Sequence, residues 1–213
     1  MERKQRKTES VSPLPPKTEI FCEGAKTEPH YLREIVNLIN KRCSEYAKSQ
    51  RIKLRDHIKI IGAGRSTTSL MSFAVDNVDR DTSIVWLVYD KDDFPEDQFD
   101  IMPTLAEKRS QSGETRYSIA WSNECFELWL LLHFIPLEAQ ISRDQYIKKL
   151  KDDYVPNYHK SMPDVFDQLR NRVQTAIDHA IKLEEKYGEI PLSQRNPGTN
   201  MHELVKELME YID

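Results

Sequence analysis

The chain has 213 residues, of which 38% are hydrophobic and 31% are charged, and its formal net charge is -4. This length suits one domain, or one domain with an appendage, and it is enough to bury a substantial core. The negative balance argues against a protein that holds polyanions through bulk charge alone, although local basic segments can still contact phosphate.

Membrane insertion and a cysteine framework are not expected. No apolar run approaches the roughly 20 residues that span a bilayer, and the N-terminus lacks the apolar core of a signal peptide. Cys22, Cys43 and Cys125 are an odd number without CxxC spacing, which favours neither a disulfide framework nor a zinc site. We therefore expect a cytoplasmic protein with no membrane partner.

The first 17 residues are basic and end in a proline-rich run, so we expect a disordered tail over 1–17. The fold should begin near Thr18, with a strand over 18–22. Thr27 can cap a helix whose apolar residues follow at helical spacing. Gly24 lies between these two elements, where it allows a tight turn and a close approach of the backbone to a phosphate.

Strands and helices then alternate along the chain. Further strands are expected over 56–61, 83–89 and 116–121. Helices are expected over 67–78, 98–112 and 125–133, the last of them very apolar. This alternation predicts an α/β fold, in which helices flank a parallel sheet with right-handed crossovers.

The region beyond Pro136 has no convincing strand pattern. It is expected to be helical over 143–152, 162–187 and 201–212. We therefore predict an α/β core over 18–135 and a helical C-terminal region over 136–213 that packs on the core.

Two acidic clusters follow expected strands at the points where those strands end. They are Glu23 with Glu28, and Asp90 with Asp92 and Asp93. Because ligands of open α/β sheets collect beyond the carboxyl ends of the strands, we expect these carboxylates to converge. Close carboxylates raise one another's pKa unless a cation neutralises them. Oxygen ligands without a Cys/His cluster favour Mg²⁺ or Mn²⁺, ions that suit phosphate chemistry.

The pattern resembles known proteins. Glu23-Gly24 after the first strand and Asp90-x-Asp92 after the third resemble the Toprim fold of type IA and II topoisomerases, bacterial primases and small nucleases. The segments 22–28 (CEGAKTE), 122–134 (SNECFELWLLLHF) and 196–200 (NPGTN) are similar to those of the RloB-like family.

The resemblance to the RloB-like family implies a Toprim domain and a metal-dependent nuclease that cuts DNA or RNA. It also implies a place in bacterial anti-phage defence, with an ABC/AAA-type ATPase as partner. One departure concerns Glu124, which stands where the family usually has proline after Ser-Asn. Its carboxylate either joins the metal site or faces solvent.

The residues and the resemblance together suggest roles for the acidic side chains. Catalytic and metal-binding roles fall to Glu23, Asp90, Asp92 and Glu127, with Asp93 as a further metal or second-sphere group. Glu23 would be a metal ligand or a general acid/base. The competing interpretations are turn formation for Glu23, Asp90 and Asp92, and a structural ion pair with an arginine for Glu127.

For several other polar residues, the sequence allows two interpretations of their role. Lys26 and Arg65 are candidates for contacts with substrate phosphate, or else solvated surface charges. Glu28 either joins the acidic site or favours the helix macrodipole from the first turn. His133 is expected to be a hydrogen-bonded core residue rather than a ligand.

Two other functions compete with the nuclease. In the first, the chain is a non-catalytic interaction or sensor subunit of a defence complex. In the second, it is a receiver-like domain phosphorylated at the end of the third strand. Glu23-Gly24 lacks the acidic pair that a receiver needs at the first strand, and no fifth strand with a suitable lysine is evident, so the receiver is disfavoured.

Overall fold

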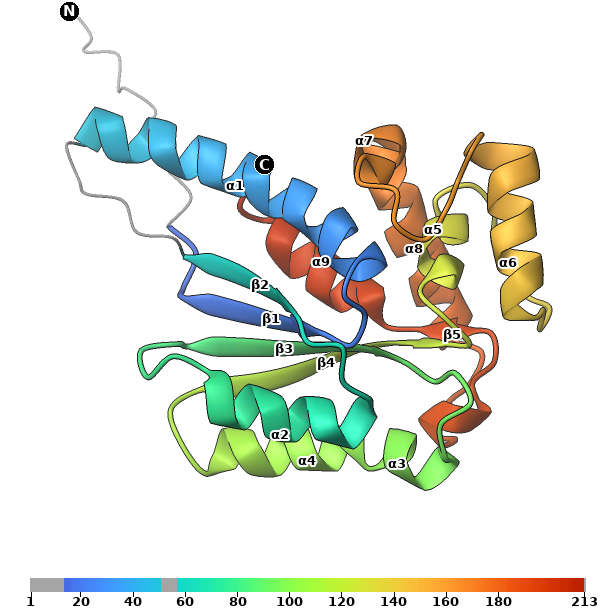
Figure 1. Cartoon of the computed structure of the whole chain (residues 1–213), viewed down its shortest axis with the longest axis horizontal. Coiled ribbons are helices and arrows are strands. Elements are labelled where there is room, and N and C mark those ends of the chain that lie inside the picture. The colour runs from blue at the N-terminus through green and yellow to red at the C-terminus, as the bar shows by residue number, and fades with distance from the viewer. Residues whose placement is uncertain (1–13, 51–56, 213) are drawn as a thin grey trace, which may run out of the picture.

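The computed structural model describes residues 14–50 and 57–212, and its centre is a five-stranded sheet (Figure 1). The strands are β1 (Thr18–Cys22), β2 (Ile58–Gly62), β3 (Ile84–Asp90), β4 (Arg116–Asn123) and β5 (Gly198–Thr199). Their order across the sheet is β2-β1-β3-β4-β5. The first four strands are parallel, and β5 runs antiparallel to β4. The predicted α/β class with a mostly parallel sheet is therefore confirmed.

Helices cover both faces of the sheet (Figure 1). One face carries α1 (Thr27–Gln50) and α9 (Met201–Met209), and the other carries α2 (Thr67–Asn77), α3 (Glu96–Asp100) and α4 (Met102–Gln111). Alternate residues of β1 serve the two layers, because Ile20 and Cys22 pack with α1 while Phe21 packs with α2. A strand with two buried faces has a nearly continuous apolar sequence, as β3 does over residues 84–89.

The C-terminal helices gather beyond the carboxyl ends of the strands (Figure 1). They are α5 (Glu127–Leu132), α6 (Arg143–Lys149), α7 (Val165–Leu169) and α8 (Val173–Glu184). A π-helical turn over Leu150–Tyr154 extends α6, and short 3-10 turns occupy Arg170–Arg172 and Leu192–Gln194. Their apolar side chains belong to the same hydrophobic cluster as those of α1. The region beyond Pro136 thus shares one core with the sheet.

The prediction that no strand follows Pro136 is wrong, because β5 pairs with the end of β4. Asn123 lies opposite Gly198, and Ser122 lies opposite Thr199. A strand of two residues is too short to display an alternating pattern, so sequence periodicity could not reveal it.

Several predicted boundaries also shift. The single helix expected over 98–112 is two helices, α3 and α4, with Pro103 in the first turn of α4, where proline is tolerated. The helix expected over 162–187 is divided by the 3-10 turn at Arg170–Arg172. The helix expected over 125–133 spans Glu127–Leu132, and the strand expected over 56–61 spans Ile58–Gly62.

The expected tail over 1–17 lies mostly outside the described residues. Lys17 is described, and its ammonium forms ion pairs with Asp79, at 3.0 Å, and with Asp81. Among the described residues, no helix combines the length and apolar character needed to cross a membrane.

Candidate functional site

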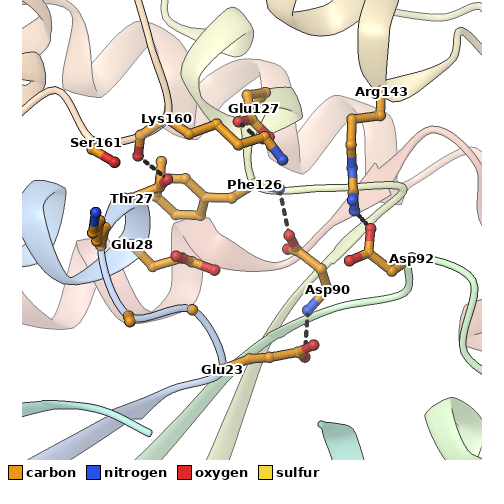
Figure 2. A pocket seen from close by; sticks show the side chains of 13 residues that line it. Glu23, Thr27, Glu28, Asp90, Asp92, Phe126, Glu127, Arg143, Lys160 and Ser161 are labelled. Carbon is orange, nitrogen blue, oxygen red and sulfur yellow. Dashed lines mark hydrogen bonds and ion pairs between the residues drawn. The ribbon is translucent and has the colours of Figure 1, made fainter. Parts of the chain in front are cut away.

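A cavity of about 340 Å³ opens at the carboxyl edge of the sheet, where the ends of β1 and β3 meet (Figure 2). The parallel register sets this meeting, because Cys22, the last residue of β1, lies opposite Val88, two residues before β3 ends at Asp90. Its acidic lining residues are Glu23, Glu28, Asp90, Asp92 and Glu127, and its basic ones are Lys26, Arg143 and Lys160. We call this space the acidic cavity. Four of the acids in it were predicted as site residues.

Glu23 and Asp90 are joined directly. The Glu23 Oε2 atom accepts a hydrogen bond of 3.3 Å from the backbone N–H of Asp90. Burial raises the pKa of Glu23 to about 7, and the nearby Glu28 carboxylate adds to the rise, while the Asp90 N–H and Arg143 oppose it. Glu23 therefore changes its protonation near neutral pH.

Asp90 connects the end of β3 to the beginning of α5. Its Oδ2 atom accepts a hydrogen bond of 3.1 Å from the backbone N–H of Phe126. Burial raises the pKa of Asp90 well above its ordinary value, and the carboxylates of Glu28, Glu127 and Glu23 raise it further. The side chain is thus held in place at an electrostatic cost.

Glu28 and Glu127 form the deep wall of the acidic cavity. Glu28 is 6% exposed and Glu127 is 2% exposed. Burial raises the pKa of Glu28, and Glu127 raises it further while Lys160 lowers it. The partners of Glu127 are the Tyr158 hydroxyl, which donates at 3.1 Å, and the Lys160 ammonium at 4.0 Å. The competing interpretation was an ion pair between Glu127 and an arginine, and the described residues instead give Glu127 a tyrosine and a lysine as partners.

Asp92 lines the acidic cavity and forms an ion pair with Arg143 (Figure 2). Its backbone φ is 42°, in the left-handed region that aspartate tolerates better than most residues. Such positions occur often at functional sites, where the surrounding structure holds them. Asp93, the next residue, is exposed and is not among the residues that line the acidic cavity.

The two residues predicted to contact phosphate lie in different places. Lys26 lines the acidic cavity. Arg65 does not, and its guanidinium lies over the Phe73 ring, 5.5 Å from the ring centroid. Of the two cations, the structure brings only Lys26 to the carboxylates.

Arg143 and Lys160 line the acidic cavity although sequence reasoning did not select them. The segment that carries Lys160 is held over the beginning of α1, where the Thr27 hydroxyl donates to the Lys160 carbonyl oxygen. Neither cation stands in a recognisable motif, and both lie far along the chain from the acids. His133, in contrast, is a core residue as expected, fully buried and 3.1 Å from the Tyr31 hydroxyl.

The donor set of the acidic cavity suits a hard divalent cation. Glu28 raises the pKa of Glu23, Glu127 raises the pKa of Glu28, and all three of these carboxylates raise the pKa of Asp90, so a counter-charge is needed to hold the group ionised. All of the candidate ligands are carboxylate oxygens, which Mg²⁺ and Mn²⁺ prefer. The residues present therefore fit such an ion.

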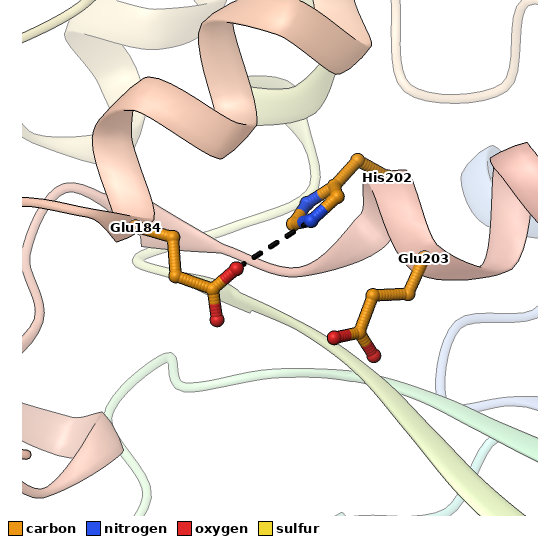
Figure 3. Close-up of side chains that lie close together, drawn as sticks. All are labelled: Glu184, His202 and Glu203. Carbon is orange, nitrogen blue, oxygen red and sulfur yellow. Dashed lines mark ion pairs between the residues drawn. The ribbon is translucent and has the colours of Figure 1, made fainter.

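A second group of ligand side chains lies between the end of α8 and the beginning of α9 (Figure 3). Ligand atoms of Glu184, His202 and Glu203 all lie within 4.8 Å of one another, and this group could hold a metal ion. Burial lowers the pKa of His202 to about 4, so its ring is neutral at pH 7. Within the described ranges, these three residues meet the 4.8 Å spacing, and no three carboxylates of the acidic cavity do.

Comparisons with known proteins give one match. The sequence model of the family described as RloB-like protein matches residues 19–208. The search of curated proteins and the search of solved structures each gave no match.

Proposed function

The chain belongs to the RloB-like protein family, and we propose that it is a divalent-metal-dependent nuclease whose active site is the acidic cavity. The observation that carries this proposal is the convergence of Glu23, Asp90, Asp92 and Glu127 around one space at the carboxyl edge of the sheet. Three cations surround the same space and supply the positive charge that a nucleic acid backbone requires.

In this proposal Mg²⁺ or Mn²⁺ is the cofactor, held by Glu23, Asp90, Asp92 and Glu127, with Asp93 outside the lining residues as a second-sphere group. When bound, the ion would polarise the phosphodiester and stabilise charge on the transferring phosphate. Glu28 belongs with the ligands rather than with the helix terminus alone, because its buried carboxylate faces the same cavity.

The chain's own side chains would then orient and protonate the substrate. Lys26, Lys160 and Arg143 would bind the phosphates on either side of the scissile bond. Glu23 has a pKa of about 7 and can accept a proton from water, or return one to the leaving oxygen, at neutral pH. The net charge of -4 does not conflict with this role, since the cations are local to the site.

The family resemblance extends the proposal to partners. We propose that the substrate is DNA or RNA, and that the enzyme acts in anti-phage defence with an ABC/AAA-type ATPase. The competing hypothesis of a non-catalytic subunit differs in one respect that can be measured, since it requires the ATPase partner but no hydrolysis.

The test is cleavage of labelled total RNA and plasmid DNA in Mg²⁺, Mn²⁺ or EDTA, with and without the neighbouring ATPase. We expect cleavage that requires the divalent ion and falls about 10²- to 10⁴-fold in Glu23→Gln and Asp90→Asn. The matched control is Asp76→Asn, an exposed change on α2 that should leave the rate unchanged. Cleavage that persists in Asp90→Asn would refute the site, and no cleavage of either substrate under any condition would favour the non-catalytic subunit.

A further inference from the structure

A second cavity of about 710 Å³ adjoins the acidic cavity, and Asp92 lines both. Its walls come from the loop after β3, the end of β4, the beginning of α6 and the segment before β5. Five side-chain amides line it, from Asn123, Gln140, Gln145, Gln194 and Asn196. We call it the amide cavity.

Two of the amides build the wall of the amide cavity. The Asn123 Nδ2 atom donates to the Ser193 carbonyl at 2.9 Å, and the Gln145 Oε1 atom accepts from the Ser142 N–H at 2.8 Å, in the cap of α6. The other three retain free hydrogen-bonding groups. In the part of the chain that the structure describes, the Asn196 Oδ1 atom is buried without a partner, and the side chains of Gln140 and Gln194 have no hydrogen bond. An amide offers both a donor and an acceptor to a ligand.

The charges around the amide cavity favour an uncharged group over a phosphate. Lys91 is its cation, but the Lys91 ammonium donates to the carbonyl oxygens of Phe94 and Asp92 and is already engaged. Glu96 and Glu124 line the cavity with carboxylates that have no ion pair among the described residues. A phosphate group would be repelled there, whereas a polar neutral group with N–H donors would be held.

We propose that the amide cavity binds a nucleobase next to the phosphodiester in the acidic cavity, and that it prefers guanine. This inference rests on the proposed nuclease function and names the substrate feature that the same site recognises. Each nucleobase presents donors and acceptors at its edge, and side-chain amides and carboxylates pair with them in geometries that discriminate among bases. Because Asp92 lines both cavities, the base and the phosphate belong to adjacent positions of one strand.

Glu124 provides the preference for guanine. Its side chain is half-buried, and its carbonyl oxygen accepts the N–H of Asp92 at 3.1 Å, which fixes it beside the loop after β3. A carboxylate is an acceptor with two oxygens, and the Watson–Crick edge of guanine offers two parallel N–H donors to it. Adenine, cytosine and uracil cannot supply that pair of donors, so each would leave one carboxylate oxygen without a hydrogen bond.

The test is calorimetric titration of the full-length protein with the 5′-monophosphates of guanosine, adenosine, cytidine and uridine in Mg²⁺. We expect GMP to bind about tenfold more tightly than the other three. Glu124→Gln should abolish this preference, because the amide has one acceptor oxygen and cannot accept both N–H groups. Gln194→Leu should weaken GMP binding about tenfold, since it keeps the size of the side chain and removes the donor and acceptor that the amide offers to the base.

The matched control is Glu114→Gln, which makes the same chemical change at an exposed position before β4, at the opposite edge of the sheet. Thermal unfolding and Mn²⁺ binding of all three variants should equal those of the wild type. Equal affinity for the four nucleotides, or a GMP preference that survives both cavity variants, would overturn the inference. Failure of the nuclease would appear separately, as absence of Mn²⁺ binding and of cleavage, while the nucleotide titrations still decide the amide cavity.

Discussion

At the scale of single residues, Arg143 has two competing roles. Its guanidinium forms an ion pair with Asp92 in the described structure. In the proposed substrate complex, the same group would contact a phosphate. Removing its charge should free Asp92 for the metal and weaken substrate binding. We predict that Arg143→Gln binds Mn²⁺ up to about fivefold more tightly, a gain that matches the small energy of a partly exposed ion pair. Its cleavage rate should nevertheless fall at least tenfold, because a charged contact to phosphate is lost.

Mn²⁺ affinity by calorimetry and single-turnover cleavage measure these two effects independently. Arg170→Gln is a suitable control, since Arg170 is exposed in the 3-10 turn before α8 and lies outside the acidic cavity. Weaker Mn²⁺ binding in Arg143→Gln would show that Arg143 supports the acidic cluster rather than competing with the ion.

The acidic residues of the site could be predicted from sequence, and most of its cations could not. Glu23, Asp90 and Asp92 lie at or just after the ends of apolar strands, and the parallel register brings these ends together independently of the conformation of the loops. Arg143 and Lys160 reach the same cavity through the packing of the C-terminal region, which no local pattern encodes. Arg65 also follows a strand, but its guanidinium lies over the Phe73 ring and outside the acidic cavity, so a position after a strand does not by itself bring a basic residue to the site.

At the scale of elements, the pairing of β5 with β4 anchors the beginning of α9. The Thr199 hydroxyl donates to the Trp121 carbonyl at 2.7 Å, and the Asn200 Oδ1 atom accepts the Trp121 N–H at 2.7 Å. The close approach requires glycine at position 198, since a Cβ there would lie 2.5 Å from the Arg195 carbonyl oxygen. We predict that Gly198→Ala lowers the free energy of unfolding by about 1–3 kcal/mol, as other overpacked sites do.

Urea unfolding of purified protein measures this change. Gly113→Ala is the matched control, because a Cβ at Gly113 meets no atom within 4 Å. Its free energy of unfolding should stay the same or rise slightly, through the reduced entropy of the unfolded chain. Equal effects of the two substitutions would mean that the β4–β5 contact adapts without cost.

Element prediction succeeded where a pattern is long and failed where it is short. The amphipathic spacing after Thr27 and the apolar run over 84–90 each specify an element over several turns or residues. The two-residue β5 has no such length, and its strand character lies in its pairing with the end of β4. The break between α7 and α8 likewise has no proline or glycine to announce it.

At the scale of the whole molecule, the C-terminal helices cover the carboxylates at the sheet edge and so influence their pKa values. They share one hydrophobic cluster with α1 and the sheet, and their packing buries Glu28 and Glu127 and leaves Asp90 half-buried. Burial is the largest cause of the raised pKa values of Glu23, Glu28 and Asp90. The fold therefore stores unfavourable electrostatic energy that a divalent cation would relieve.

This arrangement predicts how the stability of the whole protein depends on pH and metal. Glu23 keeps its proton in the folded state up to about pH 7, but loses it near its ordinary value of 4.5 when unfolded. The folded state then binds more protons than the unfolded state, so stability falls as pH rises through 7. His133 and His202, with pKa values lowered to about 4, act in the opposite direction, but only below about pH 6.5.

Without a divalent ion, the melting temperature should therefore fall between pH 6.5 and pH 8, and Glu23→Gln should flatten that decline. At pH 8, Mn²⁺ at about 100 times its dissociation constant should add about 2.7 kcal/mol, or about 5–11 °C for a chain of this size. The gain should shrink toward pH 6, where protons compete with the ion for Glu23 and Asp90. Scanning calorimetry over this range, with Mn²⁺ or EDTA, measures all three effects. Two outcomes would contradict this prediction: a melting temperature that rises from pH 6.5 to pH 8 in EDTA, or a Mn²⁺ gain that Glu23→Gln and Asp90→Asn leave intact. Either outcome would place the metal outside the acidic cavity. The next group to substitute would then be Glu184, His202 and Glu203.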